Sequence, residues 1–322
     1  MKRLALVLLV LLSFSLPARA QEEERQFSYW LQDLVKEAIA AGIRPQTAHY
    51  ALSELEYDPS IVELEQKQPE KTATAKEYWE KIITDERIQR GHDFYAANRL
   101  ILTQIGDAYG VQPRFIVALF GIESDYGDRQ GSADVIRSLT SLAFNGLRPK
   151  LFKDELFNAL RILDQGHVSL TNLQGSWAGA LGYCQFMPSS FLKYGQDYDR
   201  DGRTDIWTNV ADAAASAANY LRENGWRKTE TWGREVRLVQ PIPDEFVGLS
   251  VLRSVKEWSK MGVRQLNNKK LPATGLMASL ILPDCPGGPA FLVYNNFHVL
   301  MRWNKSTYFA TAVGKLSDLL DR

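Results

Sequence analysis

Cysteine is scarce in this chain of 322 residues, since only Cys184 and Cys285 are present. Two cysteines so far apart do not imply a disulfide framework. We favour two independent buried thiols, with a Cys184–Cys285 bond as the alternative. Histidine is scarce too: its four positions show no spacing typical of a metal site or a catalytic triad, and no G-x-S-x-G motif occurs. Catalysis by a histidine-bound metal or a serine nucleophile therefore has little support in the sequence.

An excess of charge of one sign is also missing. The chain has 38 Lys and Arg against 38 Asp and Glu, for a formal net charge of zero. Removal of residues 1–20 would take away Lys2, Arg3 and Arg19 and no acidic residue, which leaves 35 against 38 and a net charge of −3. This balance argues against nucleic acid as a partner and against the binding of a polyanion by bulk charge.

Long apolar segments are confined to the beginning of the chain. A basic start is followed by an apolar run over residues 4–16 and by the small-x-small triplet at 18–20. This pattern predicts a signal peptide over 1–20, and the run is short for a membrane span. No cysteine lies near the cleavage point, so we expect no membrane anchor. The prediction is an exported protein that is soluble in the periplasm.

The remaining chain has enough apolar residues, 45% of the sequence, to bury a large core. Helical spacing dominates residues 27–107 and recurs at 135–144, 151–164 and 211–220. Residues 236–240 and 290–294 look like strands, and prolines interrupt the region around them. We therefore predict a mainly α (α+β) fold. Its parts would be a helical lobe (21–110), a core (111–232), a small β-containing lobe (233–300) and a C-terminal helix within 301–322.

One apolar run, residues 115–127, carries a carboxylate near its end. Pro113 suits the first turn of a helix, because its missing N–H has no partner there. In such a helix Glu123 shares a face with the apolar residues three, four and seven positions before it. Burial would raise its pKa and let it hold a proton near neutral pH, as a general acid does. The alternative is a buried glutamate that pairs with an arginine or lysine.

A second run, residues 175–191, alternates glycine with small and aromatic residues before a proline. Glycine permits close approach of the backbone and positive φ angles. Aromatic residues beside Ser176 and Gln185 suit a sugar, whose ring faces are apolar and whose rim is hydroxylated. The run therefore favours a sugar site over its alternative, a tightly packed start of a helix.

A third run, residues 197–205, places acidic residues at positions one, three and five, glycine at six and aspartate at nine. This is the first half of an EF-hand calcium loop. Thr208 stands where the loop usually has glutamate, so Asp212 would supply the closing ligand through a longer loop. Calcium is the favoured interpretation, and a solvated acidic turn is the alternative.

Together these runs resemble the lytic murein transglycosylase B family of peptidoglycan-cleaving enzymes. The resemblance covers nearly the whole mature chain and rests on several motifs in one order: G-I-E-S-D-Y-G at 121–127, G-S-W-A-G-A at 175–180, Q-F-M-P-S-S at 185–190, the acidic loop at 197–212, A-N-Y at 218–220 and R-W-N-K-S-T-Y at 302–308. It implies a lysozyme-like helical core between a helical lobe and a small β-containing lobe.

The resemblance also implies roles for single residues. Glu123 would be the catalytic acid. The implied substrate-binding residues are Ser176, Gln185, Phe186, Met187 and Tyr220, and more loosely Tyr78, Arg148 and Asn304. The family usually has tyrosine before that asparagine; Trp303 keeps an aromatic platform there but loses the hydroxyl. The implied calcium ligands are Asp197, Asp199, Asp201, the Arg203 carbonyl and Asp212.

A single-acid mechanism fits better than the usual pair of carboxylates, because Asp125 lies on the wrong face of a helix to assist Glu123. For Asp125 we expect a role at the helix end or on the surface. The resemblance implies that Glu123 acts first as acid and then as base, and that muramyl O6 closes onto C1 without water. The alternatives are a lysozyme-like hydrolase of the same bond and a non-catalytic glycan-binding wall protein. Implied partners are peptidoglycan glycan strands and wall-synthesis proteins, and we expect a monomer.

Overall fold

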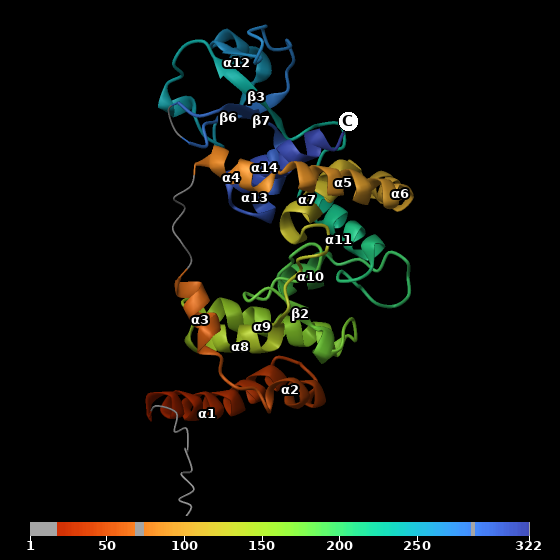
Figure 1. The fold of residues 1–322 in the computed structure, drawn as a ribbon, viewed down its shortest axis with the longest axis vertical. Coiled ribbons are helices and arrows are strands. Elements are labelled where there is room, and N and C mark those ends of the chain that lie inside the picture. The colour runs from red at the N-terminus through yellow and green to blue at the C-terminus, as the bar shows by residue number, and fades with distance from the viewer. Residues whose placement is uncertain (1–17, 68–73, 285–286, 322) are drawn as a thin grey trace, which may run out of the picture.

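The structure is a computed structural model and describes residues 18–67, 74–284 and 287–321. Helices dominate it, and a small antiparallel sheet lies at one end of the long axis (Figure 1). The mainly α fold predicted from the sequence is therefore confirmed. Residues 1–17 of the expected signal peptide lie outside the described part, and 18–20 begin the first helix. None of the helices in the described part has the length and apolar character required to cross a bilayer.

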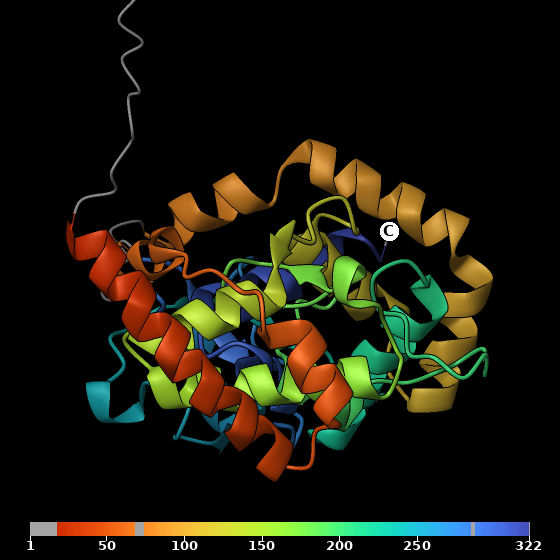
Figure 2. The same ribbon diagram turned by 90° about the horizontal axis from the view of Figure 1, so that it is seen from below.

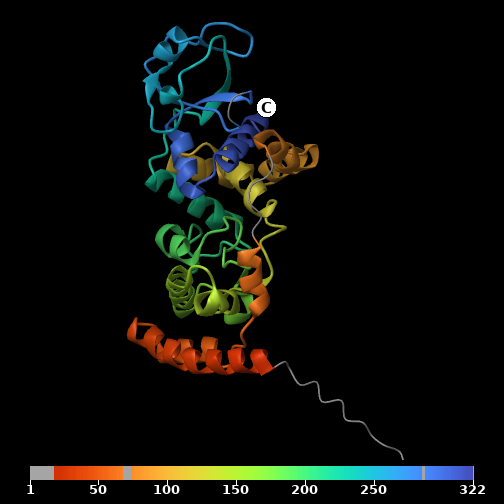
Figure 3. The same cartoon turned by 90° about the vertical axis from the view of Figure 1, so that its left-hand side faces the viewer.

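The first three helices pack at the end of the molecule opposite the sheet (Figures 1 and 3). They are α1 (Ala18–Ala40), α2 (Pro45–Leu52) and α3 (Pro59–Gln66). Helix α2 contacts α9 (Pro149–Asp164), and α3 contacts α8 (Val135–Asn145). Asp134 caps α8 by accepting a hydrogen bond from the Arg137 amide.

The next three helices run along the rim of the molecule, where Figure 2 shows them following one another. They are α4 (Ala75–Ile82), α5 (Asp85–Ala97) and α6 (Arg99–Tyr109). They contact α14 (Thr307–Leu319), α7 (Pro113–Ser124) and α11 (Val210–Glu223), respectively. The helices of the expected helical lobe (21–110) therefore pack against two different sets of later segments.

Helix α7 lies at the centre of this arrangement and contacts α5, α6, α11 and α14. Pro113 occupies its first turn, and every residue from Phe115 to Gly121 is buried. The helix ends because Asp125 and Tyr126 adopt left-handed backbone angles, with φ of 53° and 61°. Residues 115–121 therefore fix the helix in the core and leave Glu123 at its C-terminal end.

Short elements connect α9 to α11. They are the 3-10 helix η1 (Leu170–Asn172), β2 (Gln174–Gly175), which pairs antiparallel with β1 (Ala133–Asp134), and α10 (Pro188–Tyr194). Residues 175–186 lie between β2 and α10 as a glycine-rich loop closed by backbone bonds between Leu181 and Phe186. The loop belongs to the site described below.

The β-containing lobe has a five-stranded antiparallel sheet in the order β4-β6-β7-β3-β5. Its elements are β3 (Gly233–Leu238), η2 (Asp244–Phe246), β4 (Arg253–Ser254), α12 (Val255–Lys260), β5 (Val263–Arg264), β6 (Met277–Ile281) and β7 (Ala290–Val293). The two strands expected from the sequence correspond to β3 and β7. Helix α13 (Asn295–Trp303) crosses the expected boundary at residue 300. Trp258 is fully buried in a core that is separate from that of the helical region.

Candidate active site

Glu123 is in the last turn of α7, where its side chain is partly exposed. Protein nevertheless surrounds the carboxyl group densely, and this desolvation raises its pKa to about 7. Among the described residues, no lysine, arginine or histidine nitrogen lies within 4 Å of it, as the ion pairs in that part of the chain show. The alternative of a glutamate paired with a buried cation is therefore wrong. A carboxyl group with these properties can donate a proton at neutral pH.

The hydrogen-bond partner of Glu123 is Trp303, at the C-terminal end of α13. Its indole Nε1–H donates to Glu123 Oε1 over 2.7 Å. From the sequence we expected Trp303 as an aromatic platform that lacks the hydroxyl of the usual tyrosine. The structure adds that the indole N–H supplies a donor directly to the acid. Sequence reasoning missed this contact, because 180 positions separate the two residues.

Three aromatic rings from different elements form a cluster beside the acid. Phe186 and Trp303 have ring centroids 5.1 Å apart, and Tyr220 and Trp303 have centroids 4.7 Å apart in an edge-to-face arrangement. The Tyr220 hydroxyl donates to the backbone carbonyl of Arg302 over 2.7 Å, which ties α11 to α13. The structure therefore brings Phe186 and Tyr220 together with Glu123, as the resemblance implied.

The glycine-rich loop is held next to the end of α7. The Ser124 hydroxyl donates to the carbonyl of Tyr183 over 3.0 Å. A Cβ at Gly182, where φ is +60°, would lie 2.3 Å from the carbonyl oxygen of Ile206, so only glycine fits there. The loop is therefore packed closely, and in this respect it agrees with the alternative to a sugar site, a tightly packed segment.

Ser176 and Gln185 are both half-buried in this loop. The Ser176 hydroxyl accepts a hydrogen bond from the Ala180 amide over 3.0 Å. Gln185 has a left-handed backbone (φ 46°), and its amide nitrogen donates to the carbonyls of Gln130 and Gly182. The carbonyl oxygen of that side chain remains able to accept a bond from a ligand.

The other expected substrate-binding residues are placed unevenly. Tyr78 of α4 packs against Tyr308. Burial raises the pKa of the Tyr78 hydroxyl, and the charge of Glu123 raises it further, so Tyr78 and the acid interact electrostatically. Met187 is half-buried at the start of α10, and Asn304 is exposed just after Trp303. Arg148 pairs with Glu65 of α3 and lies over the Phe152 ring, contacts that belong to the packing of α3 against α8 and α9.

Asp125 is two residues from Glu123 but serves another purpose. It caps α7 in a left-handed conformation, and its carboxylate pairs with Arg90 at 2.7 Å, Arg87 at 3.4 Å and Arg129 at 3.5 Å. The role at the helix end is confirmed, but the side chain is only 9% exposed and is not a surface group. The two α5 arginines, which carried no signal in the sequence, hold this end of the helix.

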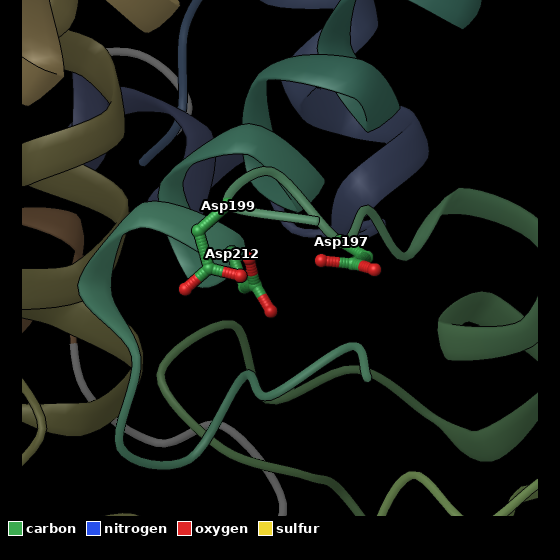
Figure 4. A group of neighbouring side chains, drawn as sticks. All are labelled: Asp197, Asp199 and Asp212. Carbon is green, nitrogen blue, oxygen red and sulfur yellow. The ribbon is translucent and has the colours of Figure 1, made fainter. Parts of the chain in front are cut away.

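The acidic loop gathers three of its carboxylates. Ligand atoms of Asp197, Asp199 and Asp212 all lie within 4.8 Å of one another, and Figure 4 shows the side chains converging from the loop and from α11. This spacing fits oxygen ligands around Ca²⁺, which binds them at about 2.3–2.6 Å. Asp212 is fully buried and accepts from the amides of Tyr198 and Asp205, while burial raises its pKa.

Asp201 and Arg203, two other residues of the implied ligand set, are joined by a hydrogen bond. The Asp201 carboxylate accepts a bond from the Arg203 amide over 2.8 Å, and Asp201 is exposed and outside the group of three. Asp205, at position nine, accepts bonds from the amides of Trp207 and Thr208 and so shapes the turn. The donor set that the structure assembles is therefore smaller than the set implied by the resemblance.

A hollow of about 960 Å³ lies between residues 127–132, the segment around His167 and the acidic loop. Neither Glu123 nor any member of its aromatic cluster lines it. Size alone would make it a candidate ligand site, but a reaction site needs an acid with a suitable pKa, and Glu123 has one. We therefore place the candidate active site at Glu123.

Cys184 lies in the same loop and is fully buried. It is a free thiol that contacts the carbonyl of Ala213 at 3.4 Å, and burial raises its pKa well above the ordinary value. This agrees with the favoured buried thiol for Cys184. Cys285 lies outside the described residues.

Comparison with known proteins identifies the family. A family model described as the transglycosylase SLT domain matches residues 26–318. The chain belongs to this family. It is 32% identical over 246 residues to the membrane-bound lytic murein transglycosylase B of Escherichia coli (strain K12), an alignment that covers 74% of this chain and 65% of that relative. The resemblance drawn from the motifs is therefore confirmed.

Solved structures of the family share the fold. The transglycosylase-family chain superimposes on SltB3 from Pseudomonas aeruginosa in complex with NAG-anhNAM-pentapeptide with a TM-score of 0.89 at 39% identity, covering 92% of this chain and 79% of that one. It also matches the Escherichia coli lytic transglycosylase Slt35 in complex with calcium, with a TM-score of 0.78 at 29% identity and coverage of 90% and 92%. The expected lysozyme-like fold is confirmed by these matches.

Proposed function

We propose that this chain is a lytic transglycosylase that cleaves the β-1,4 bond between N-acetylmuramic acid and N-acetylglucosamine in peptidoglycan. Membership of the transglycosylase family supports the class of reaction. The observation that carries the mechanism is Glu123, whose carboxyl group is desolvated, has a pKa of about 7 and receives a hydrogen bond from Trp303. Such a group is protonated in a useful fraction of molecules at neutral pH and can also act as a base once ionised.

In the first step, protonated Glu123 donates its proton to the glycosidic oxygen as the bond from that oxygen to C1 of the muramyl residue breaks. The 2-acetamido carbonyl of the same sugar stabilises C1, as in substrate-assisted glycosidases. In the second step, ionised Glu123 accepts the proton of the muramyl O6 hydroxyl while O6 bonds to C1. The products are a 1,6-anhydromuramyl end and a free N-acetylglucosamine hydroxyl, and no water is consumed.

One carboxylate suffices for this sequence of steps, and the structure supports a single-acid mechanism. Asp125 is occupied by three arginines. No other carboxylate contributes to the raised pKa of Glu123: among the described residues burial raises it, and the hydrogen bond from Trp303 acts in the opposite direction. A double-displacement hydrolase would need a second carboxylate about 5 Å from the first.

The substrate would contact the side chains that surround Glu123. We assign this role to Ser176, Gln185, Phe186, Met187, Tyr220, Tyr78 and Asn304, with Trp303 beside the acid. Arg148 contacts Glu65 and Phe152 and none of the residues around Glu123, so it would bind a part of the glycan strand farther from the bond that is cleaved. Phe186 and Tyr220 offer apolar surface, and Gln185 offers a carbonyl oxygen to sugar hydroxyls or acetamido N–H groups.

We further propose that the acidic loop binds Ca²⁺ through Asp197, Asp199 and Asp212, with Asp201 and the Arg203 carbonyl as the additional ligands implied by the family. When bound, the ion would offset most of the negative charge of the three convergent carboxylates and tie the loop to α11. The protein would act in the periplasm as a monomer, on glycan strands and beside wall-synthesis proteins. Within it, we propose residues 21–322 as the catalytic region, made up of a helical lobe (21–110), a lysozyme-like core (111–232), a small β-containing lobe (233–300) and a C-terminal helix (301–322).

Mass analysis of the products from purified sacculi tests this function. The expected products end in 1,6-anhydromuramic acid and are lighter by one water than hydrolysed muropeptides. Reducing ends in the products would establish the hydrolase instead. Binding to sacculi without any released product, under conditions where a known transglycosylase is active, would establish a glycan-binding protein.

A further inference from the structure

We propose that Trp303 is a positioning residue that confines the transferable proton of Glu123 to Oε2, because its indole N–H permanently occupies Oε1. This inference rests on the proposed function, in which Glu123 is the acid. It goes beyond the aromatic platform that the sequence suggested for this position.

The argument begins with the donor itself. An indole N–H can donate a hydrogen bond but cannot accept one. Trp303 Nε1 lies 2.7 Å from Glu123 Oε1, so Oε1 must present a lone pair to it in both protonation states of the carboxyl group. A proton on Oε1 would face the indole hydrogen and lose the bond. The acidic proton therefore belongs on Oε2.

A tyrosine at the same position would not impose this choice. A phenolic hydroxyl can donate or accept, so either carboxyl oxygen could carry the proton. Tyrosine, which the resemblance implies for this position in the family, would thus be an adaptable partner, whereas Trp303 is a fixed one.

The indole can act as a fixed partner only if it cannot turn away, and its surroundings hold it. Phe186 and Tyr220 pack against the ring with centroid separations of 5.1 and 4.7 Å. Phe186 is 3% exposed, and the Tyr220 hydroxyl is bonded to the carbonyl of Arg302, the residue before Trp303. The aromatic cluster therefore locks the ring that orients the acid.

Two consequences distinguish positioning from simple stacking on sugar. A donor on Oε1 stabilises the ionised carboxylate, so its removal should raise the pKa of Glu123. The loss of proton placement should lower kcat, whereas the loss of a platform for sugar should raise KM. A net hydrogen bond of about 1 kcal/mol corresponds to roughly 0.7 pKa unit.

The test compares Trp303→Phe with the control Trp226→Phe. Trp226 is buried, whereas Trp303 is half-buried, and the Trp226 indole donates to the Gln112 side chain over 2.8 Å rather than to Glu123. Titration of the Glu123 side-chain carboxyl by ¹³C NMR in the free enzyme should show an upward shift of roughly half to one pH unit in W303F and none in W226F. The kcat of W303F should fall about 10-fold or more with the alkaline limb of its pH profile moved upward. Trp303→Tyr should recover part of both effects.

A measurement on the wild type can decide the proposal even if W303F fails to fold. The indole Hε1 resonance of Trp303 should titrate with the midpoint of Glu123, and Glu123→Gln should abolish that titration. An Hε1 signal that ignores pH, or a W303F variant with unchanged carboxyl pKa and a raised KM only, would overturn the proposal. Failure of the wild type to release anhydro products would instead remove the proposed function, while the two titrations would still decide the hydrogen bond.

Discussion

At the scale of single residues, Glu123 and Asp125 show how two carboxylates in one sequence motif receive opposite environments. The Glu123 carboxyl has an indole N–H and apolar protein around it, and its pKa is raised to about 7. Asp125 has three guanidinium groups within 3.5 Å. Glu123 can therefore exchange a proton near neutral pH, while the Asp125 side chain is held in place by its ion pairs.

Glu123→Gln should abolish turnover of sacculi while the protein stays folded. The amide keeps the shape of the side chain but has no proton to transfer in either step. General acid or base catalysis contributes about 10²–10⁴-fold, and one group that serves twice should reach the upper part of that range. Product release measured on sacculi would check this, with binding to sacculi as the control for a folded site. Near-normal turnover would exclude Glu123 from the mechanism.

The stability of the protein should also depend on Glu123 in a defined pH range. Its folded pKa of about 7 lies above its ordinary value of 4.5, so the folded state favours the protonated form. Relative to Glu123→Gln, the wild type should lose about 2–3 kcal/mol of unfolding free energy as the pH rises from 4.5 to 7, and no more above it. Urea unfolding of both proteins at pH 4.5 and pH 8 measures the difference. A constant difference between them would show that the pKa is not raised.

At the scale of elements, the C-terminal end of α7 depends on α5. Arg87 and Arg90 of α5 reach the Asp125 carboxylate, and Arg90 also donates to the Asp125 carbonyl over 2.8 Å. The position of Glu123 is therefore set by a neighbouring helix as well as by its own.

Asp125→Asn should destabilise the protein by about 2 kcal/mol, because it leaves the partly buried guanidinium groups of Arg87 and Arg90 without their anion. It should also lower kcat roughly 10-fold or more by displacing the end of α7. Asp128→Asn is the matched control, since Asp128 also pairs with Arg90 but is 74% exposed. Thermal unfolding and turnover of both variants check the prediction, and equal effects at the two positions would contradict it.

The acidic loop and α11 should be joined by calcium. Binding to the folded state alone raises stability by about 2.7 kcal/mol at a concentration 100 times the Kd. The Tm should therefore rise with Ca²⁺ and fall with a chelator, and Asp199→Asn should remove the response. Asp201→Asn should weaken it less, because the Asp201 carboxylate accepts from the Arg203 amide and lies outside the group of three. A full response in Asp199→Asn would refute the site.

The elements that the sequence predicted well are those set by local signals. Pro113 marked the start of α7, and helical spacing over 135–144 and 211–220 marked most of α8 and α11. The elements it missed depend on distant partners: β4 and β5 have two residues each, and β4, β5 and β6 are defined by pairing with other strands. The contact from Trp303 to Glu123 was missed for the same reason, since helical spacing says nothing about residues on separate helices.

At the scale of the whole molecule, the packing divides the chain differently from its order in sequence. Helices α1–α3 join α8 and α9, whereas α4–α6 join α7, α11 and α14. Composition could not show this division, because each of α1–α6 has an apolar face and the helices differ only in which later helices pack against that face. The β-containing lobe was closer to the prediction, since it has its own core around Trp258.

Trp258→Ala should therefore unfold the β-containing lobe in preference to the helical region. Removal of a fully buried tryptophan costs about 3–5 kcal/mol, and its indole bond to the carbonyl of Ala278 is lost as well. Hydrogen exchange should increase in β3–β7 and change little in α7. Leu252→Ala, at a position 54% exposed, is the control. Equal loss of protection in α7 would show that the two cores unfold together.

The hydrogen bond between Glu123 and Trp303 has a consequence for when the protein can act. Glu123 lies 180 positions before Trp303, so α13 is synthesised long after the helix that carries the acid. A nascent or clipped chain that lacks α13 has the acid but not the group that orients it. The proposed activity should therefore appear only after α13 has been made and packed, and copies that lack α13 should not cleave the glycan.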